Sequence, residues 1–137
     1  MKAASFSLSD YSFDKVSIDY SKKTGNEISI DFDPKGLFKL KDESAVFELT
    51  FVFNAIDKVS AQQFINIECH AIFTFAEVIA FDDIPEYFYG NSIAILFPYI
   101  RAFISTVTLQ ANLGPFVLPT MNLSSLEEPL RKNTTVE

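Results

Sequence analysis

The chain has 137 residues, the length of one ordinary domain, with a formal net charge of -7 at pH 7 and a pI near 4.6. It is 48% hydrophobic and has 15 Phe against 4 Gly, more aromatic rings than a small interior readily holds. The acidic balance, with no cluster of Lys or Arg, argues against nucleic acid as a partner. We therefore predict a single domain over residues 1–137 with apolar side chains left to cover a partner, a ligand or a second copy.

Cysteine usage and the N-terminal residues predict a reducing compartment. The one cysteine, Cys69, excludes an internal disulfide and a zinc knuckle. Residues 1–14 lack the apolar core of a signal peptide. The most apolar stretch, residues 93–107, is interrupted by Arg101 and followed by polar residues, whereas a bilayer span needs about 20 apolar residues. We expect a cytoplasmic protein that is not inserted in a membrane.

Alternation of apolar and polar residues predicts two strands in the first part of the chain. Residues 11–20 alternate with one slip of phase, which predicts a bulge or a break in the strand near Asp14 and Lys15. Residues 27–33 alternate without a slip and follow a turn signal at residues 23–26. We predict that these two strands form a hairpin.

The next part of the chain predicts two longer strands. We expect Pro34 and Gly36 to end the second strand, and residues 38–40 to resume a short one. Residues 45–56 and 64–75 then alternate over their whole length, which is typical of strands with one buried and one wet face. The expected sheet is long, four-stranded and antiparallel.

The period changes to that of helices after the last strand. Residues 82–91 predict a short helix that Gly90 or Asn91 breaks. A long helix is then predicted over residues 92–113, with a kink at Pro98 because proline lacks a backbone donor.

Strands come first and helices last, so the predicted class is α+β. After the long helix we expect extended chain, one helical turn and a polar tail. The ends, about residues 1–8 and 129–137, are predicted to be frayed.

Few side chains in the sequence could carry catalysis. His70 is the one histidine, and the strand pattern places it on the wet face beside Glu68. Cys69 falls on the apolar face, where a thiol is inert. Asp82 and Asp83 are explained as helix caps. No nucleophile, phosphate-binding or metal-binding motif occurs, so we expect no catalytic residues, no metal, no cofactor and no enzymatic activity.

The predicted long helix is apolar on two sides. On a helical wheel, Ile95 and Tyr99 lie on one side, and Leu96 and Ile100 lie on another. The sheet covers only one side of a helix, so the second side needs another partner. We expect a self-associated oligomer with this helix at the seam, with a three-layer monomer as the alternative.

The residues of this helix and its flanks resemble the export chaperone SecB. Residues 95–101 read ILFPYIR, where SecB sequences typically have N-I-L-F-P-Y-A-R. Residues 71–73 stand where the family has G-I-F, and Leu118 and Asn122 match parts of a later F-P-x-L-N-L run. The correspondence extends over residues 64–126, with looser agreement in the strands before it.

The resemblance implies a SecB-like fold assembled as a dimer of dimers, a homotetramer with its helices between the sheets. It also implies ATP-independent holding of unfolded or nascent polypeptides in apolar surface grooves, in the service of protein export. The positions that match the family's client-binding grooves are Ile30, Phe32, Phe73, Phe116, Leu118, Met121 and Leu123. Those that match the contacts between dimers are Tyr99, Ser105 and Leu109.

The chain also departs from SecB. At the positions of the family's acidic patch for the motor ATPase SecA it has Lys15, Asp19 and Asn66, so Asp19 is the one candidate translocase contact. Pro129 interrupts the family's terminal helix. These departures favour a stand-alone SecB-like chaperone, including one dedicated to a toxin–antitoxin pair. The remaining alternative is a small-ligand-binding, hot-dog-like oligomer, although residues 92–113 lack the carboxylate that such an enzyme usually has.

Overall fold

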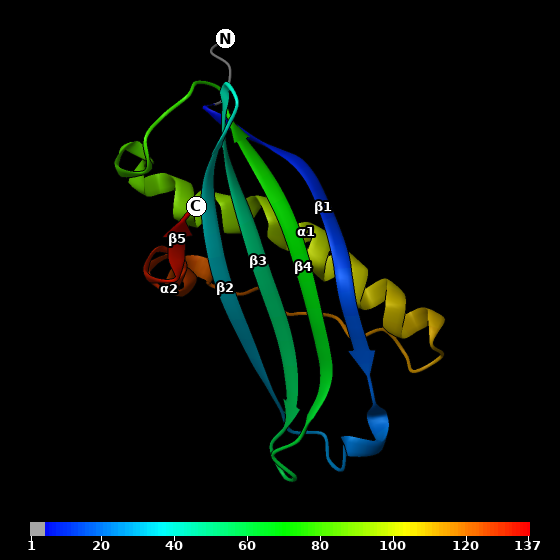
Figure 1. Cartoon of the computed structure of the whole chain (residues 1–137). Helices are drawn as coiled ribbons and strands as arrows, with labels where there is room; N and C mark the ends of the chain where they lie inside the picture. Colours follow the sequence, from blue (N-terminus) through cyan, green and yellow to red (C-terminus); the bar gives the residue numbers. More distant parts are fainter. Residues whose placement is uncertain (1–4) are drawn as a thin grey trace.

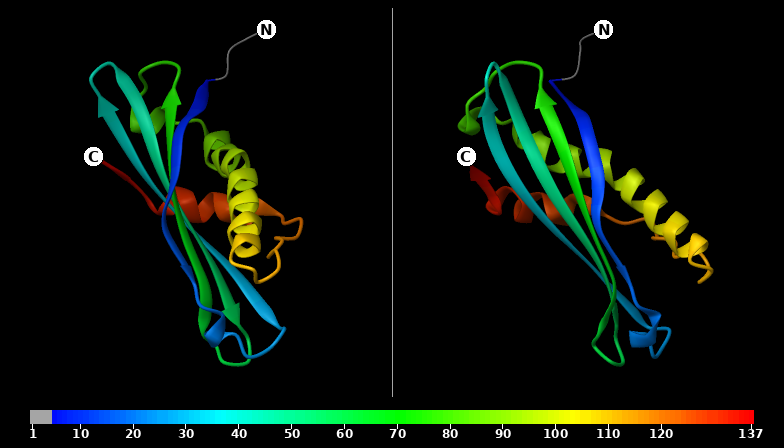
Figure 2. Two further views of the ribbon diagram at one scale, coloured as in Figure 1. Left: turned by 90° about the vertical axis from the view of Figure 1, so that its right-hand side faces the viewer. Right: turned by 45° about the vertical axis from the view of Figure 1, so that its right-hand side comes forward.

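The computed structural model describes residues 5–137, in which a long twisted sheet carries both helices on one face (Figures 1 and 2). The elements, with η for 3-10 turns, are β1 (Phe6–Ile18), η1 (Tyr20–Lys22), β2 (Ile28–Lys41), β3 (Ser44–Asp57), β4 (Gln63–Phe75), η2 (Phe81–Asp83), α1 (Glu86–Gln110), η3 (Leu123–Leu126), α2 (Glu127–Lys132) and β5 (Thr134–Val136). The strand order is β1-β4-β3-β2-β5. α1 crosses one face of the sheet diagonally, and the other face is bare (Figure 2).

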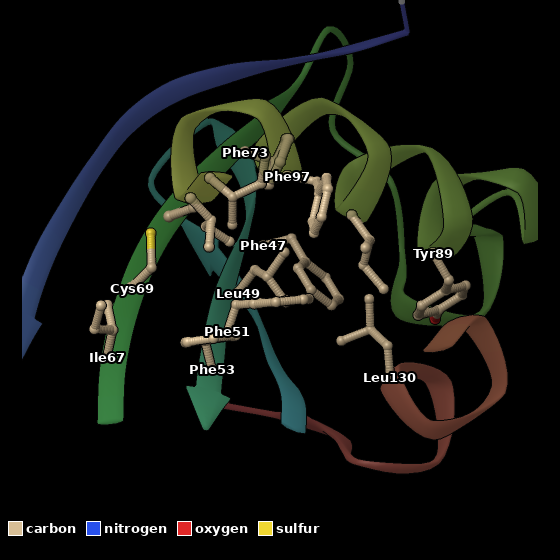
Figure 3. Packing of buried hydrophobic residues seen from close by; sticks show 14 of the residues in the cluster. Phe47, Leu49, Phe51, Phe53, Ile67, Cys69, Phe73, Tyr89, Phe97 and Leu130 are labelled. Atoms are coloured by element: carbon tan, nitrogen blue, oxygen red, sulfur yellow. The ribbon is translucent and has the colours of Figure 1, made fainter. Parts of the chain in front are cut away.

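The core lies between the sheet and α1 because β3 and β4 turn every second side chain inward. The inward residues of β3 are apolar, four of the six are large, and all are at most 1% exposed: Ala45, Phe47, Leu49, Phe51, Phe53 and Ala55. Figure 3 shows several of them facing Phe97 and Tyr89 of α1 and Leu130 of α2. The alternate residues, such as Glu48 and Thr50, are half-exposed on the bare face. The predicted α+β class and the predicted wet face are confirmed.

The sheet differs from the prediction in its number of strands and in its pairing. The four antiparallel strands are present, but β5 adds a fifth that runs parallel to β2, so the sheet is mixed. The predicted hairpin of the first two strands is wrong, because β1 pairs with β4 while β2 pairs with β3. Alternation defines which face of a strand is buried but not which strand lies beside it.

The predicted bulge in β1 is confirmed. The register of β1 against β4 shifts between Phe13 and Lys15, which leaves Asp14 unpaired, and shifts once more between Leu8 and Asp10. The N-terminal end was predicted to be frayed over about residues 1–8, but β1 already begins at Phe6. Residues 1–4 of that prediction lie outside the described residues. Phe6 anchors this end, because its ring lies 4.7 Å from that of Phe88 on α1.

Pro34 and Gly36 do not end β2, contrary to the prediction. β2 continues through both to Lys41, paired with β3 throughout. Proline is tolerated in edge strands, and β5 covers β2 only from Gly36 onward. Gly36 is needed for close approach: a Cβ there would stand 2.2 Å from Cζ of Phe47 and 2.6 Å from Oγ1 of Thr134.

The two predicted helices over residues 82–113 are a single helix, α1. Gly90 and Asn91 do not break it, because buried Phe88, Tyr89 and Ile93 on either side hold this turn on the core. Gly90 instead leaves room for α2, since a Cβ there would meet Oε2 of Glu127 at 3.2 Å. The helix order is therefore long then short, not short then long. α1 has the length and composition of a bilayer span, but 39% of its most apolar window is buried in this fold.

Residues 129–137 are not frayed, contrary to the prediction. Leu130 is 0% exposed in the core, and the guanidinium of Arg131 lies 5.2 Å from the Tyr89 ring and 3.3 Å from Oε1 of Glu86. β5 follows and pairs with residues 36–38 of β2. The pairing of β5 with β2 could not be predicted from the sequence, because a strand of three residues is too short to show periodicity.

Candidate functional site

After α1 the chain turns back across the helix side of the sheet. Asn112 and Gly114 make the turn with φ of +62° and +80°, and the N–H of Leu113 donates to the Thr108 carbonyl at 3.1 Å. Residues 113–122 then pass behind the sheet from the end of α1 toward α2 (Figure 1). α1 thus ends at Gln110, three residues before the predicted Leu113.

Two hydroxyl groups of α1 fix this returning segment. The N–H of Phe116 donates to Oγ1 of Thr108 at 2.8 Å, while Ser105 donates its hydroxyl to the Phe116 carbonyl at 3.3 Å. Thr108 is 0% exposed and donates in turn to the Ile104 carbonyl at 2.7 Å. Both backbone groups of Phe116 are therefore held by the helix. Ser105, predicted as a contact between dimers, thus makes a hydrogen bond within its own chain.

Fixing Phe116 creates an apolar surface beside the helix. Its ring lies 6.1 Å from Phe53 and 6.4 Å from Phe64. On the other side of Phe53, the Phe32 ring stands 5.6 Å away and also contacts Phe97 of α1 at 5.9 Å. Phe32 of β2 and Phe116 of the returning segment are therefore half-buried rings that pack against the same core residue, Phe53, which is 1% exposed.

Five of the seven predicted client-binding residues lie on this side of the sheet and are half-buried against the core. We call them the inner apolar surface: Ile30, Phe32, Phe116, Met121 and Leu123. Leu123 begins η3, which packs against both β2 and α1. Phe73 and Leu118 are instead 0% exposed, so they support this surface from within the core and do not face a ligand.

A second apolar surface lies on the exposed side of α1, next to the edge strand β1, whose Tyr11 ring is 4.7 Å from that of Tyr99. We call it the outer face of α1, and its exposed residues are Tyr87, Ala94, Ile95, Pro98, Tyr99, Ala102 and Leu109. Tyr99 and Leu109, both predicted at a seam, are 43% and 55% exposed. A hollow opens at its N-terminal end, between Phe6 of β1 and Asn91. The predicted second apolar side of the helix is present. β1 covers part of it, since the Phe13 ring stacks on Phe103 at 3.9 Å, and the rest is exposed in the single chain.

The bare face of the sheet holds the histidine. Nε2 of His70 lies 2.9 Å from Oε2 of Glu68 and 3.5 Å from Oδ2 of Asp14, and Nδ1 lies 3.1 Å from Oγ1 of Thr50. Its predicted position beside Glu68 is confirmed. Both ring nitrogens have cross-strand or neighbouring partners, which gives His70 a structural explanation.

Cys69 faces the core on the opposite side of the same strand. Burial raises the pKa of its thiol to about 12, with a smaller contribution from the charge of Asp14. A thiol with this pKa is protonated at neutral pH and is a poor nucleophile. Within residues 5–137, no three His, Cys, Asp or Glu side chains are grouped so that they could hold a metal ion.

Asp19 and Asp57 accept hydrogen bonds from turns at the end of the sheet where the loops after β1 and β3 lie. Asp19 accepts hydrogen bonds from the hydroxyl and the N–H of Ser21, which lower its pKa. Asp57 is 0% exposed, and its carboxylate accepts backbone N–H groups from both Thr24 and Gly25 of one loop. It accepts two more from residues 59 and 60 of the other loop. Asp57 was not predicted from the sequence, although Asp and Ser are typical turn residues.

The arrangement of these elements is a SecB-like fold. The chain is similar to a SecB-like chaperone of Mycobacterium tuberculosis, solved in complex with a ChAD peptide from the HigA1 antitoxin. The TM-score is 0.55 at 13% identity, over 85% of this chain and 91% of that one. It is also similar to a protein of unknown function from Streptococcus agalactiae, with a TM-score of 0.49, 9% identity, and coverage of 87% and 100%.

Sequence comparison adds one partial match. Over 69 residues the chain is 44% identical to an uncharacterized protein of Methanocaldococcus jannaschii. The matched region covers 46% of this chain and 44% of that protein. The chain thus spans less than half the length of this relative. No protein-family profile matches. The SecB-like fold is therefore shown by the structural comparison alone.

Proposed function

We propose that this protein is a SecB-like chaperone that holds unfolded polypeptides by apolar contact and without ATP. The observation that carries the proposal is the inner apolar surface, which stays half-exposed beside a core that is already filled. We propose that extended chain contacts Ile30 and Phe32 of β2 and Phe116 of the returning segment, which are half-buried apolar residues. Contacts of this kind are nondirectional, so they suit clients of many sequences. Binding, and not catalysis, is the function that this arrangement supports.

The energetics fit a weak and general binder. Burial of one large apolar side chain contributes roughly 1.5–3 kcal/mol. Three or four client side chains thus supply the roughly 8 kcal/mol of a micromolar complex, before the cost of ordering the client. Tighter binding requires one client to engage several copies of the surface, which an oligomer provides.

We propose a homotetramer in the cytoplasm, with the outer face of α1 between subunits. The exposed Tyr99 and Leu109 support this, because so large an apolar face on a helix is ordinarily covered. A role in protein export through SecA has weaker support, since Asp19 is engaged as a turn cap and Lys15 and Asn66 are not acidic.

The second candidate function is that of a chaperone dedicated to a single client. The observation in its favour is the structural neighbour, which binds a peptide of an antitoxin. A dedicated client differs from a general one in affinity and in number, because a single sequence can fit the surface closely.

Aggregation of unfolded clients tests the proposal. At a stoichiometric ratio and without ATP, the protein is expected to suppress light scattering by several unrelated clients. Met121→Asp, which puts a charge on the inner apolar surface, should remove most of the suppression. Leu40→Asp, a change at another exposed apolar residue of β2, is the matched control and should keep it.

Failure with every unrelated client contradicts general holding and leaves only the dedicated candidate. That candidate in turn requires a single natural peptide whose binding Met121→Asp weakens and Leu40→Asp does not. Equal suppression by both variants contradicts the assignment of the inner apolar surface.

A further inference from the structure

The returning segment after α1 is held in place at very few points. Of residues 114–120, only Phe116 and Leu118 are not exposed. Leu118 lies in the core, whereas Phe116 is half-buried. Within residues 5–137, the hydrogen bonds of this stretch are the two at Phe116. The position of the Phe116 ring therefore depends on those two bonds and not on pairing with a strand.

The stronger of the two bonds comes from Thr108, a polar side chain that is 0% exposed. Its hydroxyl hydrogen is used inside α1, since Oγ1 donates to the Ile104 carbonyl at 2.7 Å. A lone pair of the same oxygen accepts the N–H of Phe116 at 2.8 Å. The first bond stays within the helix, so the second is the one that connects the helix to another segment.

The second hydroxyl lies one turn away on the same side of the helix. Ser105 precedes Thr108 by three residues and donates to the Phe116 carbonyl at 3.3 Å. Fixing the N–H and the carbonyl of one residue defines the orientation of its side chain. The Phe116 ring is placed in this way 6.1 Å from Phe53 and 6.4 Å from Phe64.

We propose that Thr108 is a positioning residue for client binding: its hydroxyl holds Phe116 so that the inner apolar surface is formed before a polypeptide arrives. A preformed surface avoids the cost of ordering the segment during binding. Without the bond, fewer molecules have Phe116 in place, and the apparent affinity falls by the same factor. This proposal deepens the proposed function and rests on it.

Thr108→Val tests the proposal because valine has nearly the shape of threonine but no hydroxyl. It should raise the Kd for unfolded polypeptide by about three- to tenfold, the effect of one hydrogen bond on the population of the formed surface. Thr108→Ser keeps the hydroxyl and should restore most of the affinity. Thr106→Val makes the same change at an exposed position of α1 and is the matched control.

A double-mutant cycle distinguishes positioning from a general loss of stability. Phe116→Ala should itself weaken binding, and Thr108→Val should then have little further effect, because it acts through the Phe116 ring. A variant that merely loosens the fold would weaken binding in both backgrounds. Ser105→Ala removes the other bond from a residue that is not fully buried, and it should show the same dependence on Phe116 if Thr108→Val does not fold.

Binding is measured by fluorescence anisotropy with labelled lactalbumin that is kept unfolded by reduction and carboxymethylation. Urea unfolding of each variant checks that the fold is retained. The proposal is overturned if Thr108→Val binds as tightly as Thr106→Val, if Thr108→Ser binds as weakly as Thr108→Val, or if the loss is the same with and without the Phe116 ring. Wild-type protein that binds no unfolded polypeptide contradicts the proposed function as well, whereas the other three results leave that function intact.

Discussion

Asp57 fixes the end of the sheet that lies farthest from the helices. Its buried carboxylate joins the loop after β1 to the turn between β3 and β4, through four backbone N–H groups. These hydrogen bonds, led by those from Ser60 and Gly25, hold the pKa of Asp57 well below its usual range. One side chain therefore positions two loops that have no strand pairing with each other.

Asp57→Asn is expected to lower stability and to change its dependence on pH. The amide places an NH2 group opposite backbone donors, which leaves two of them without an acceptor. A lowered folded-state pKa contributes stability above the unfolded value of about 4, and this stability is lost as the pH falls toward the folded value.

Urea unfolding between pH 7 and pH 2 measures this effect. The wild-type free energy of unfolding should fall more steeply below about pH 4 than that of Asp57→Asn. Asp42→Asn, in the tight β2–β3 turn, is the control. Parallel pH curves for wild type and Asp57→Asn would show that the carboxylate does not hold the loops.

Sequence patterns predicted on which face of the sheet most residues lie, but not how far their side chains are buried. Phe73 and Leu118 were predicted to bind clients and are fully buried, whereas Ile30 and Phe32 remain half-exposed. All four are apolar residues on the inward side of the sheet. Their exposure depends on where α1 and the returning segment cross the strands, which alternation does not encode.

Strand β5 depends on Gly36 of β2, a residue that was predicted to end that strand. Gly36 lets the Phe47 ring lie under β2 and lets Thr134 lie beside it. β5 is then held by its ladder on residues 36–38 and by the ion pair of Glu137 with Lys39 at 3.2 Å. An exposed ion pair adds little, so the close approach at Gly36 is the main requirement.

Gly36→Ala is expected to destabilise the fold by about 1–3 kcal/mol, because the added methyl overlaps the Phe47 ring and Thr134. Hydrogen exchange should quicken at the amide of Glu137, which donates to the Phe38 carbonyl. Gly25→Ala, which meets only Cγ2 of Val59 at 3.1 Å, is the control. Unchanged exchange at Glu137 in Gly36→Ala contradicts this account of β5.

The strands and the long helix could be predicted because their periodicity extends over many residues. The bulge at Asp14 was also predicted, since a bulge shifts the phase visibly. Pairing, the fusion of the helices at Gly90 and the strand β5 could not be predicted. Each depends on contacts between segments far apart in the chain, such as that of Gly90 with Glu127.

At the scale of the whole molecule, the outer face of α1 is the surface that most needs a cover. Leu109→Asp is expected to shift the particle mass from the proposed tetramer toward a dimer, because a carboxylate at the proposed apolar seam must be desolvated. The residue is 55% exposed in the single chain, so the fold should be retained. Light scattering coupled to gel filtration measures the change.

Val78→Asp is the matched control for that change. Val78 is 57% exposed, in the loop between β4 and η2, away from the outer face of α1. Val78→Asp should leave the particle mass unchanged. The seam assignment is wrong if Leu109→Asp and Val78→Asp have the same mass as the wild type.

The proposed chaperone must bind unfolded polypeptide at the inner apolar surface and leave folded protein unbound. Fluorescence anisotropy with one labelled polypeptide, in its folded form and in a permanently unfolded form, measures this difference. We expect saturable binding of the unfolded form with a micromolar Kd, unaffected by ATP and weakened by Met121→Asp, and no binding of the folded form. Equal binding of both forms, or no saturable binding of the unfolded form, contradicts the claim.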